Sequence, residues 1–511
     1  MLEAIAGLAP DVIARHGAAL LVVIPLVLSG IAAFMPNGRL GWMLSIAGCA
    51  GSLLCAVVLL LQVQTLPGGV VSYELGGWDV PLGIEFRIDA LNVLFLLLIA
   101  AVGLLAAIFS LPTVVAEVRQ EKRALFYAAY LICFAGLLGV GATGDAFNLF
   151  VFLEISSIST YVLVALGGNR DRRAFPAALN YLMMGTIGAT FFVIGVGFLY
   201  AVTGTLNMAD IALRLRDIDG SNRAVHAGFA FIVVGLGLKS AMWPLHQWLP
   251  NAYAYAPSFV TMFLSATATK VAIYALIRFT FSVFTPDMSF EAMNFGYLFA
   301  PLAMIAMIAC SFQAVFQTDV RRMLAYSSVA QVGYMLLGVS IGTAAGLSAG
   351  MFHLVNHALM KGALFMAVAG VVLTYQGTRI NDFAGLGRAA PLTMTAFAVA
   401  GISLIGIPLT AGFQSKLALL EAMLDRGWGF AVAVIVISSI LAVFYVGRVL
   451  QAVFFLPPSN PRKARQEAPA LILIPLWILT IATLWIGIQA NWVIDLTDAA
   501  ATAALNPGGI R

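Results

Sequence analysis

The sequence predicts an all-α polytopic membrane protein with about fourteen transmembrane helices. Hydrophobic residues make up 61% of the 511 residues and charged residues only 10%, whereas a soluble globular chain carries about 25% charged residues. Apolar stretches of about 20 residues, the length that a helix needs to cross a bilayer, also recur along the chain. The composition therefore excludes a soluble globular protein.

The predicted spans follow one another without a linker long enough to separate soluble domains. They begin near Ala18, Trp42, Ile88, Ala124, Phe147, Pro176, Ala227, Pro257, Tyr297, Arg322, Gly346, Pro391, Gly427 and Pro469. We expect a single transmembrane domain over residues 1–511. It divides into helices one to three (1–123), a first repeat (124–283), a second repeat (295–456), and a last helix with a tail (469–511). Because Glu3 and Asp11 precede the first apolar run, which has no small-residue cleavage site, we expect no cleaved signal peptide.

Basic residues gather in alternate loops, which indicates the orientation of the chain. These loops hold Arg39; Arg119, Lys122 and Arg123; Arg170, Arg172 and Arg173; Arg321 and Arg322; Arg379 and Arg388; and Arg462, Lys463 and Arg465. The positive-inside rule places them in the cytoplasm, so both termini should face outward from a bacterial cytoplasmic membrane. The net charge of +4 reflects this bias together with embedded lysines. The sequence predicts no basic face exposed to water, so we expect no nucleic-acid partner.

Two segments between spans are not predicted to be membrane helices. Residues 69–78 and 84–88 alternate like strands around a Gly-Gly turn, which predicts a small external hairpin. The polar stretch 206–223, with Arg214, Arg216, Asp217 and Asp219, is too charged to span and should lie at the outer surface.

Two of the spans contain a helix-breaking proline. Helix seven should run from Phe229 to Met242, meet Pro244 and continue through residues 245–250, and helix twelve should break at Pro408. A lysine lies near each break, Lys239 in helix seven and Lys416 in helix twelve. Broken helices five spans apart are typical of inverted repeats, here helices four to eight and nine to thirteen. Unwound backbone would admit water and place free carbonyls near the ammonium groups.

Four lysines lie in or at the mouths of apolar runs: Lys239, Lys270, Lys361 and Lys416. Each charge costs about 2.5–3.5 kcal/mol at the centre of a spanning helix unless it is compensated, so we expect a function for them. Glu154 is the carboxylate most deeply embedded in an apolar run, and we expect it to pair with Lys239. Separating such a pair in a low dielectric makes proton transfer possible near neutral pH. A static clamp between two helices is the alternative.

Further polar side chains extend this predicted proton path. His353, His357 and Lys361 follow at i, i+4 and i+8, so they share one face of helix eleven. The two histidines could instead bind a metal, but no acidic ligand or H-E-x-x-H pattern accompanies them. His246 could relay protons or hydrogen-bond the freed backbone. Lys270 should bridge the two halves, whereas Arg278 should only snorkel to the surface.

No motif indicates a bound cofactor or covalent catalysis. The four cysteines, Cys49, Cys55, Cys133 and Cys310, lie in apolar runs without C-x-x-C spacing and should be small core residues. Residues 139–144 satisfy G-x-G-x-x-G, but they end an apolar helix rather than follow a strand. We therefore expect neither a metal nor a redox cofactor in this chain.

Four segments together resemble one family. They are residues 148–157 around Glu154, 239–258 from Lys239 to the Ala-Pro-Ser at its end, 319–328, and 357–365. They resemble the antiporter-like subunits shared by respiratory complex I and the multisubunit Mrp cation/proton antiporters. The resemblance implies about fourteen helices, two inverted five-helix repeats and a hydrophilic axis for lateral proton movement.

The same resemblance implies roles for individual residues. Glu154 and Lys239 are similar to the pair of helices five and seven, and Lys270 is similar to the connecting lysine of helix eight. His357 and Lys361 resemble the central relay, and Lys416 the terminal residue of helix twelve. One complex I member carries glutamate at that last position, and the chain stops soon after the last span without a long lateral helix. These features favour the D-type subunit of the Mrp antiporters.

We therefore expect a proton-conducting membrane subunit of a multisubunit monovalent cation (Na⁺)/proton antiporter. Its partners would be other membrane subunits, the lipid bilayer, protons and monovalent cations, and it would not be an enzyme by itself. The alternative is a proton-pumping subunit of an NADH–quinone oxidoreductase or a membrane-bound hydrogenase, with catalysis in partner chains. A structural scaffold with a dry ion-pair network is a third possibility.

Overall fold

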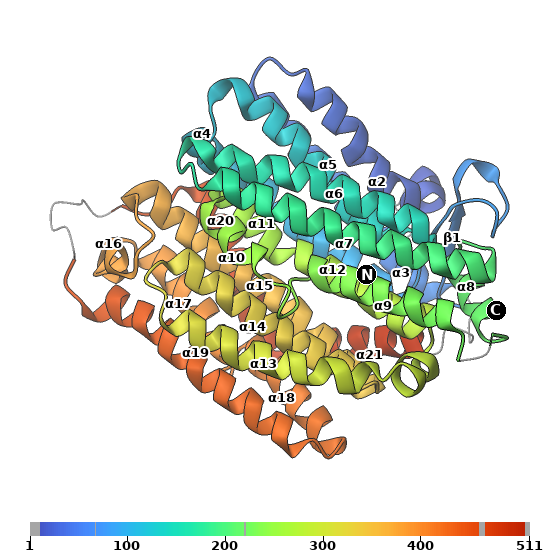
Figure 1. Cartoon of the computed structure of the whole chain (residues 1–511). Helices are drawn as coiled ribbons and strands as arrows, with labels where there is room; N and C mark the ends of the chain where they lie inside the picture. Colours follow the sequence, from blue (N-terminus) through green and yellow to red (C-terminus); the bar gives the residue numbers. More distant parts are fainter. Residues whose placement is uncertain (1–10, 67, 219–220, 459–465, 506–511) are drawn as a thin grey trace.

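Long helices packed side by side form almost the whole molecule (Figure 1). The computed structural model describes residues 11–66, 68–218, 221–458 and 466–505. Within these ranges twelve helices are long and apolar enough to cross a membrane, or thirteen if the bent pair Ile380–Ala389 and Pro391–Ile405 forms one span. The predicted all-α polytopic fold is thereby confirmed.

The elements follow the predicted spans closely. The first half contains α2 (Asp11–Ala33), α3 (Gly38–Thr65), α4 (Ala90–Glu117), α5 (Arg123–Ala142), α6 (Ala146–Ala165), α7 (Ala174–Thr203), α8 (Met208–Leu215), α9 (Arg223–Lys239), α10 (Trp248–Tyr255), α11 (Ser258–Ala266) and α12 (Ala268–Ile277). The second half contains α13 (Phe295–Val315), α14 (Val320–Ser340), α15 (Ala344–Tyr375), α16 (Leu386–Ala389), α17 (Pro391–Ile405), α18 (Ala411–Asp425), α19 (Gly429–Phe455), α20 (Ala470–Ile488) and α21 (Asn491–Leu505). Shorter helical segments are η1 (Leu75–Gly77), η2 (Gln120–Lys122), η3 (Leu166–Asn169), η4 (Arg278–Val283), η5 (Asp287–Ala292) and η6 (Ile380–Phe383).

The count of about fourteen spans stays a prediction. The two spans in question are the broken ones: α9 has 17 residues, and α17 and α18 have 15 each. A segment of this length falls short of the roughly 20 residues that cross a bilayer unaided. The inverted-repeat arrangement and its boundaries likewise stay predictions.

Polar side chains at the starts of several spans fix where those helices begin. Asp145 accepts a hydrogen bond from the Asn148 N–H (2.7 Å) at the start of α6, and Asp319 accepts one from Arg322 N–H (3.0 Å) at the start of α14. Such N-caps satisfy backbone donors that the first helical turn leaves free. They set the register of two helices that carry polar residues into the bundle.

Helix α15 forms the centre of the bundle. Every residue from Gly346 to Val372 is buried, and α15 packs against α11, α14, α17, α18, α20 and α21. A helix that is apolar nearly all round is stable only when other helices surround it. Polar groups on α15 are therefore shielded from lipid.

The predicted hairpin is present. Strands β1 (Val71–Glu74) and β2 (Glu85–Ile88) pair antiparallel, with Val71 opposite Ile88 and Glu74 opposite Glu85. Strand β2 also bridges to Thr143, and Asp145 bridges to Asn207, so three predicted outer loops meet at one end of the bundle. In Figure 1, β1 and α8 lie close together at that end.

Several predicted cytoplasmic loops meet at the opposite end of the bundle. Arg170 pairs with Glu117, and Asp319 forms a bridge with Arg379. This grouping agrees with loops that alternate between the two ends of the bundle. The side of the membrane that each end faces stays a prediction. Asp219 and the loop with Arg462, Lys463 and Arg465 lie outside the described residues.

Both predicted helix breaks are present, but one boundary was wrong. Helix α9 ends at Lys239 rather than Met242, because Ala241 adopts a left-handed backbone (φ 57°) and the Met242 N–H bonds back to the Gly237 carbonyl (2.9 Å). A left-handed residue together with such a backward hydrogen bond is a common end of a helix. Turns then lead to α10 at Trp248, so residues 245–247 do not continue the helix as expected. The second break, between Ile405 and Ala411, lies where it was predicted.

Helices α7 and α9 approach each other through glycines, which gives a first testable prediction. A Cβ at Gly235 would lie 2.5 Å from the Gly188 carbonyl oxygen, so Gly235→Ala should destabilise the protein by about 1–3 kcal/mol through overpacking. The measurement is the free energy of unfolding in detergent. Gly197→Ala on α7 is the control, because nothing lies within 4 Å of its Cβ position. Equal stability of the two variants would contradict this packing.

Candidate functional site

The predicted contact between Glu154 and Lys239 is confirmed. Lys239, the last residue of α9, places its Nζ 3.2 Å from Glu154 Oε1 on α6 and donates a hydrogen bond to Ser157 Oγ (2.6 Å). The lysine side chain is 7% exposed and the glutamate 21%. The carboxylate is therefore the more open partner of the pair.

Two carboxylates that lie outside the apolar runs are more deeply buried than Glu154. Glu85 and Asp89 are 1% and 4% exposed. Both lie where β2 and its following loop run into α4, outside the centre of an apolar run. Hydropathy windows do not detect burial produced by contacts between distant segments.

Lys270 is completely buried at a helix break that the sequence analysis missed. Its Nζ donates hydrogen bonds to the Ser265 carbonyl and to Thr269 Oγ1 (3.3 Å). Thr267 separates α11 from α12 with a non-helical backbone (φ −125°, ψ −59°). The interruption frees a carbonyl for the ammonium group, as expected for broken helices in membranes.

The three predicted residues of helix eleven lie buried together on α15. His353 contacts Ser415 Oγ through Nδ1 (3.0 Å) and Gln331 Oε1 through Nε2 (2.8 Å). Lys361 Nζ donates to the Leu324 carbonyl (2.8 Å) and to Ser327 Oγ. These contacts join α15 to α14 and α18, so the polar face predicted from the spacing is packed against other helices.

His357 lies between His353 and Lys361 on α15. Both of its ring nitrogens are buried and have no hydrogen-bond partner among the described residues. Buried polar nitrogens are normally satisfied by protein or by water, so this position favours hydration of the interior.

Lys416 lies at the second predicted break. Its Nζ donates to the carbonyls of Leu404 (3.1 Å) and Ile405 (2.9 Å), the last residues of α17, and to Ser439 Oγ (3.0 Å). The ammonium also stands 4.8 Å from the centre of the Tyr334 ring. Free carbonyls at a helix end and an aromatic face both favour a cation.

His246 has no hydrogen bond to these lysines among the described residues. It is buried in the turns between α9 and α10, with Nε2 3.8 Å from Cys310 Sγ on α13. Trp248 Nε1 nearby donates to the freed Leu238 carbonyl (3.0 Å). Lys239 and Lys270 are bound by different groups, Lys239 by Glu154 and Lys270 by the Ser265 carbonyl.

Arg278 does not snorkel, and its partner Asp89 was missed. The guanidinium holds both carboxylate oxygens of Asp89 (2.7 and 2.8 Å) and donates to Tyr274 Oη (3.2 Å). Burial is the largest single effect and would raise the pKa of Asp89. The charge and hydrogen bonds of Arg278, together with the Asn92 N–H and the Arg87 charge, hold the pKa below its usual value. Asp89 also caps α4 by accepting the Leu91 N–H (3.0 Å), and an acidic residue directly before a long apolar run was the available signal.

The sequence analysis also missed a cluster of charged residues at the other end of the bundle. Glu117 at the end of α4 accepts hydrogen bonds from the Ser258 N–H (2.5 Å) and from Arg170 (3.0 Å), and Arg321 lies 3.8 Å away. The cluster ties α4 to the start of α11 and to α14.

The cysteines are buried and unpaired, as expected for core residues. In the described part of the chain, no three His, Cys, Asp or Glu side chains come close enough to hold a metal ion.

Comparison with known proteins identifies relatives over nearly the whole chain. Residues 143–442 match the family model described as NADH:quinone oxidoreductase/Mrp antiporter, TM. The NADH-quinone oxidoreductase subunit N of Desulforudis audaxviator is 40% identical over 499 residues, covering 94% of this chain and 97% of the relative. The D-type subunit of the Na(+)/H(+) antiporter of Bacillus subtilis is 31% identical over 488 residues, covering 95% and 96%. A chain of the membrane-bound sulfane sulfur reductase, an archaeal respiratory membrane complex, superimposes with a TM-score of 0.88 at 32% identity, covering 97% of this chain and 99% of that one.

Proposed function

The chain belongs to the NADH:quinone oxidoreductase/Mrp antiporter transmembrane family, and on that premise we propose that it is the proton-conducting subunit of a multisubunit monovalent cation (Na⁺)/proton antiporter. The observation that carries this proposal is that four buried lysines are each held by carbonyl, hydroxyl or carboxylate oxygens, and we infer that they form a row. Relatives of this chain are subunits of multisubunit membrane complexes, so partner membrane subunits would complete the cation route.

The proposed cycle is electrostatic and begins at the ion pair. A proton or cation arriving beside Glu154 weakens its attraction for Lys239, because the carboxylate charge is then shared or neutralised. The displaced positive charge acts on Lys270 and drives a proton onward through the interior.

The second half of the cycle runs along α15. Protons would pass from Lys270 through His357 to Lys361, and then by way of His353 and Ser415 to the neighbourhood of Lys416. Lys416 would exchange protons with one aqueous side. His246 would relay protons beside the first break, and the termini would face outward from a bacterial cytoplasmic membrane.

A second candidate function is favoured by a specific comparison. The relative with 40% identity is a subunit of an NADH-quinone oxidoreductase. The same row of buried groups would serve proton pumping in such a redox complex, with electron transfer in partner chains.

Purification of the native assembly separates the two candidates. We would identify the copurified chains by mass spectrometry and reconstitute the assembly in liposomes that contain a pH-sensitive dye. An antiporter should carry protons when a Na⁺ gradient is imposed without any redox substrate, and its partners should lack flavin, iron–sulfur and nickel subunits. Proton flux that requires NADH or another electron donor, with redox subunits present, would overturn the antiporter assignment.

A further inference from the structure

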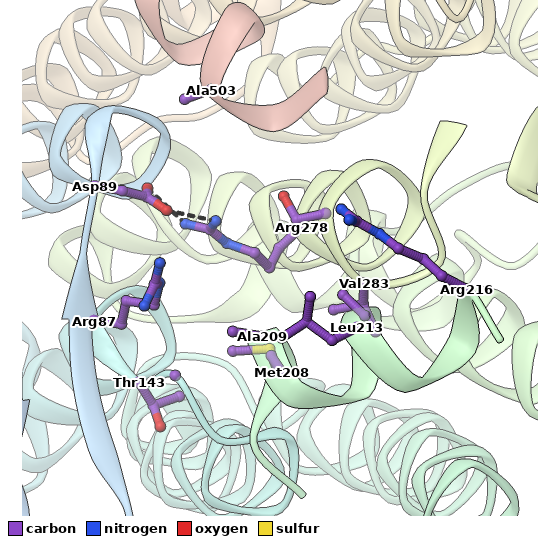
Figure 2. A pocket seen from close by; sticks show the side chains of 13 residues that line it. Arg87, Asp89, Thr143, Met208, Ala209, Leu213, Arg216, Arg278, Val283 and Ala503 are labelled. Atoms are coloured by element: carbon purple, nitrogen blue, oxygen red, sulfur yellow. Dashed lines mark hydrogen bonds and ion pairs between the residues drawn. The ribbon is translucent and has the colours of Figure 1, made fainter. Parts of the chain in front are cut away.

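A cavity of about 470 Å³ lies at the hairpin end of the bundle, away from the proposed proton path (Figure 2). Its polar side chains include Arg87 on β2, Asp89 at the start of α4, Arg216 after α8, and Arg278 and Ser282 on η4. None of the four embedded lysines or of the histidines on α15 lines it. The proposed function therefore leaves this cavity without a role.

The charges around the cavity are unbalanced. Three guanidinium groups face one carboxylate, and that carboxylate is already bound on both oxygens by Arg278. Figure 2 shows the side chains of Arg87, Arg216 and Arg278 around the same space. In the described ranges no hydrogen bond or ion pair occupies the guanidinium of Arg87 or of Arg216. Two positive charges thus remain for an anion.

An independent observation also indicates a ligand. The Ser282 hydroxyl is buried and has no hydrogen-bond partner among the described residues, although the side chain lines the cavity. The residue is only 8% exposed. A buried hydroxyl normally has a partner, and a ligand oxygen in the cavity would supply one once the Ser282 side chain turned toward it.

Besides Thr143, the remaining side chains that line the cavity are apolar, which narrows the choice of anion. Met208, Leu213 and Val283 line the cavity beside the arginines, and Leu213 is 56% exposed. A site lined by both cationic and apolar groups, at the end of a transmembrane bundle, fits a lipid headgroup and the start of its acyl chains. Guanidinium groups bind phosphate oxygens through paired donors. We propose that this cavity binds the phosphate group of an anionic phospholipid.

The test measures lipid retention by the full-length chain. The purified protein is exchanged into detergent with phosphatidylglycerol, with phosphatidylcholine or with inorganic phosphate alone, and bound molecules are counted by native mass spectrometry. The variants are Arg216→Gln, which changes an exposed side chain and so leaves the fold intact, and Arg87→Gln/Arg216→Gln. The control is Arg214→Gln on α8, because Arg214 pairs with Asp210 (3.0 Å) and does not line the cavity.

Wild type and the control should retain phosphatidylglycerol in preference to phosphatidylcholine. Arg216→Gln should bind it about tenfold more weakly, and the double variant more weakly still, because each charged donor is lost. Equal retention by all variants, or no preference for the anionic lipid, would overturn the proposal. Binding of inorganic phosphate in place of lipid would overturn the assignment to a lipid.

Discussion

Lys239→Ala should reduce cation-driven proton exchange about 100-fold or more, the range expected when a positioned proton-transfer group is lost. The substitution removes the ammonium that lies 3.2 Å from Glu154 and leaves that carboxylate without its ion-pair partner. We would measure the rate of internal pH change in proteoliposomes holding the whole assembly. Lys122→Ala is the matched control, because Lys122 is an exposed lysine in the short helical segment η2.

A paired apolar replacement distinguishes conduction from a static clamp. If Glu154 and Lys239 only hold α6 against α9, then Glu154→Leu/Lys239→Leu should restore transport, since apolar pairs replace buried ion pairs at little cost in stability. The proton-path account predicts that the double variant folds and assembles but still fails to exchange. Restored exchange would support the clamp.

Asp89→Asn should lower the free energy of unfolding by about 3–5 kcal/mol, because it leaves the buried Arg278 guanidinium without a counter-charge. Asparagine keeps a side-chain oxygen that can cap α4, so the loss reports the ion pair and not the cap. Unfolding by SDS titration would provide the measurement. Asp210→Asn is the control, since the surface pair of Asp210 with Arg214 should contribute only about 0–1 kcal/mol.

Two further results would separate the contribution of this pair from other effects. Asp89→Leu/Arg278→Met should recover most of the lost stability, because neither charge is then buried alone. The pKa of Asp89 is lowered in the folded state, so the pair stabilises the fold fully at neutral pH and ceases to do so only as pH falls through that lowered value. A wild-type stability in Asp89→Asn would show that Arg278 is compensated elsewhere.

Local signals in the sequence were sufficient for the fold class and for much of the site. Apolar runs marked the spans, prolines marked the breaks, and the spacing of His353, His357 and Lys361 placed them on one face of α15. These properties depend on near neighbours in the chain. The contact between Glu154 and Lys239 was predictable because a carboxylate embedded in an apolar run requires a cation nearby.

Contacts between distant segments could not be predicted in the same way. Asp89 and Arg278 are 189 positions apart, and only the packing of α4 against α12 brings their charges together. The break at Thr267 has no proline or glycine to mark it, and α9 ends early because Ala241, an ordinary helix former, adopts a left-handed backbone. In each case the fold overrides the local preference of the residue.

The central claim is that protons cross the interior through the buried row, and Lys361 at its centre tests it most directly. Lys361→Met removes a fully buried cation and keeps an unbranched side chain, so the protein should fold and assemble at least as stably as wild type. Proton flux in proteoliposomes of the assembly should fall about 100-fold while the melting temperature does not drop. Wild-type flux in this folded and assembled variant would contradict the account.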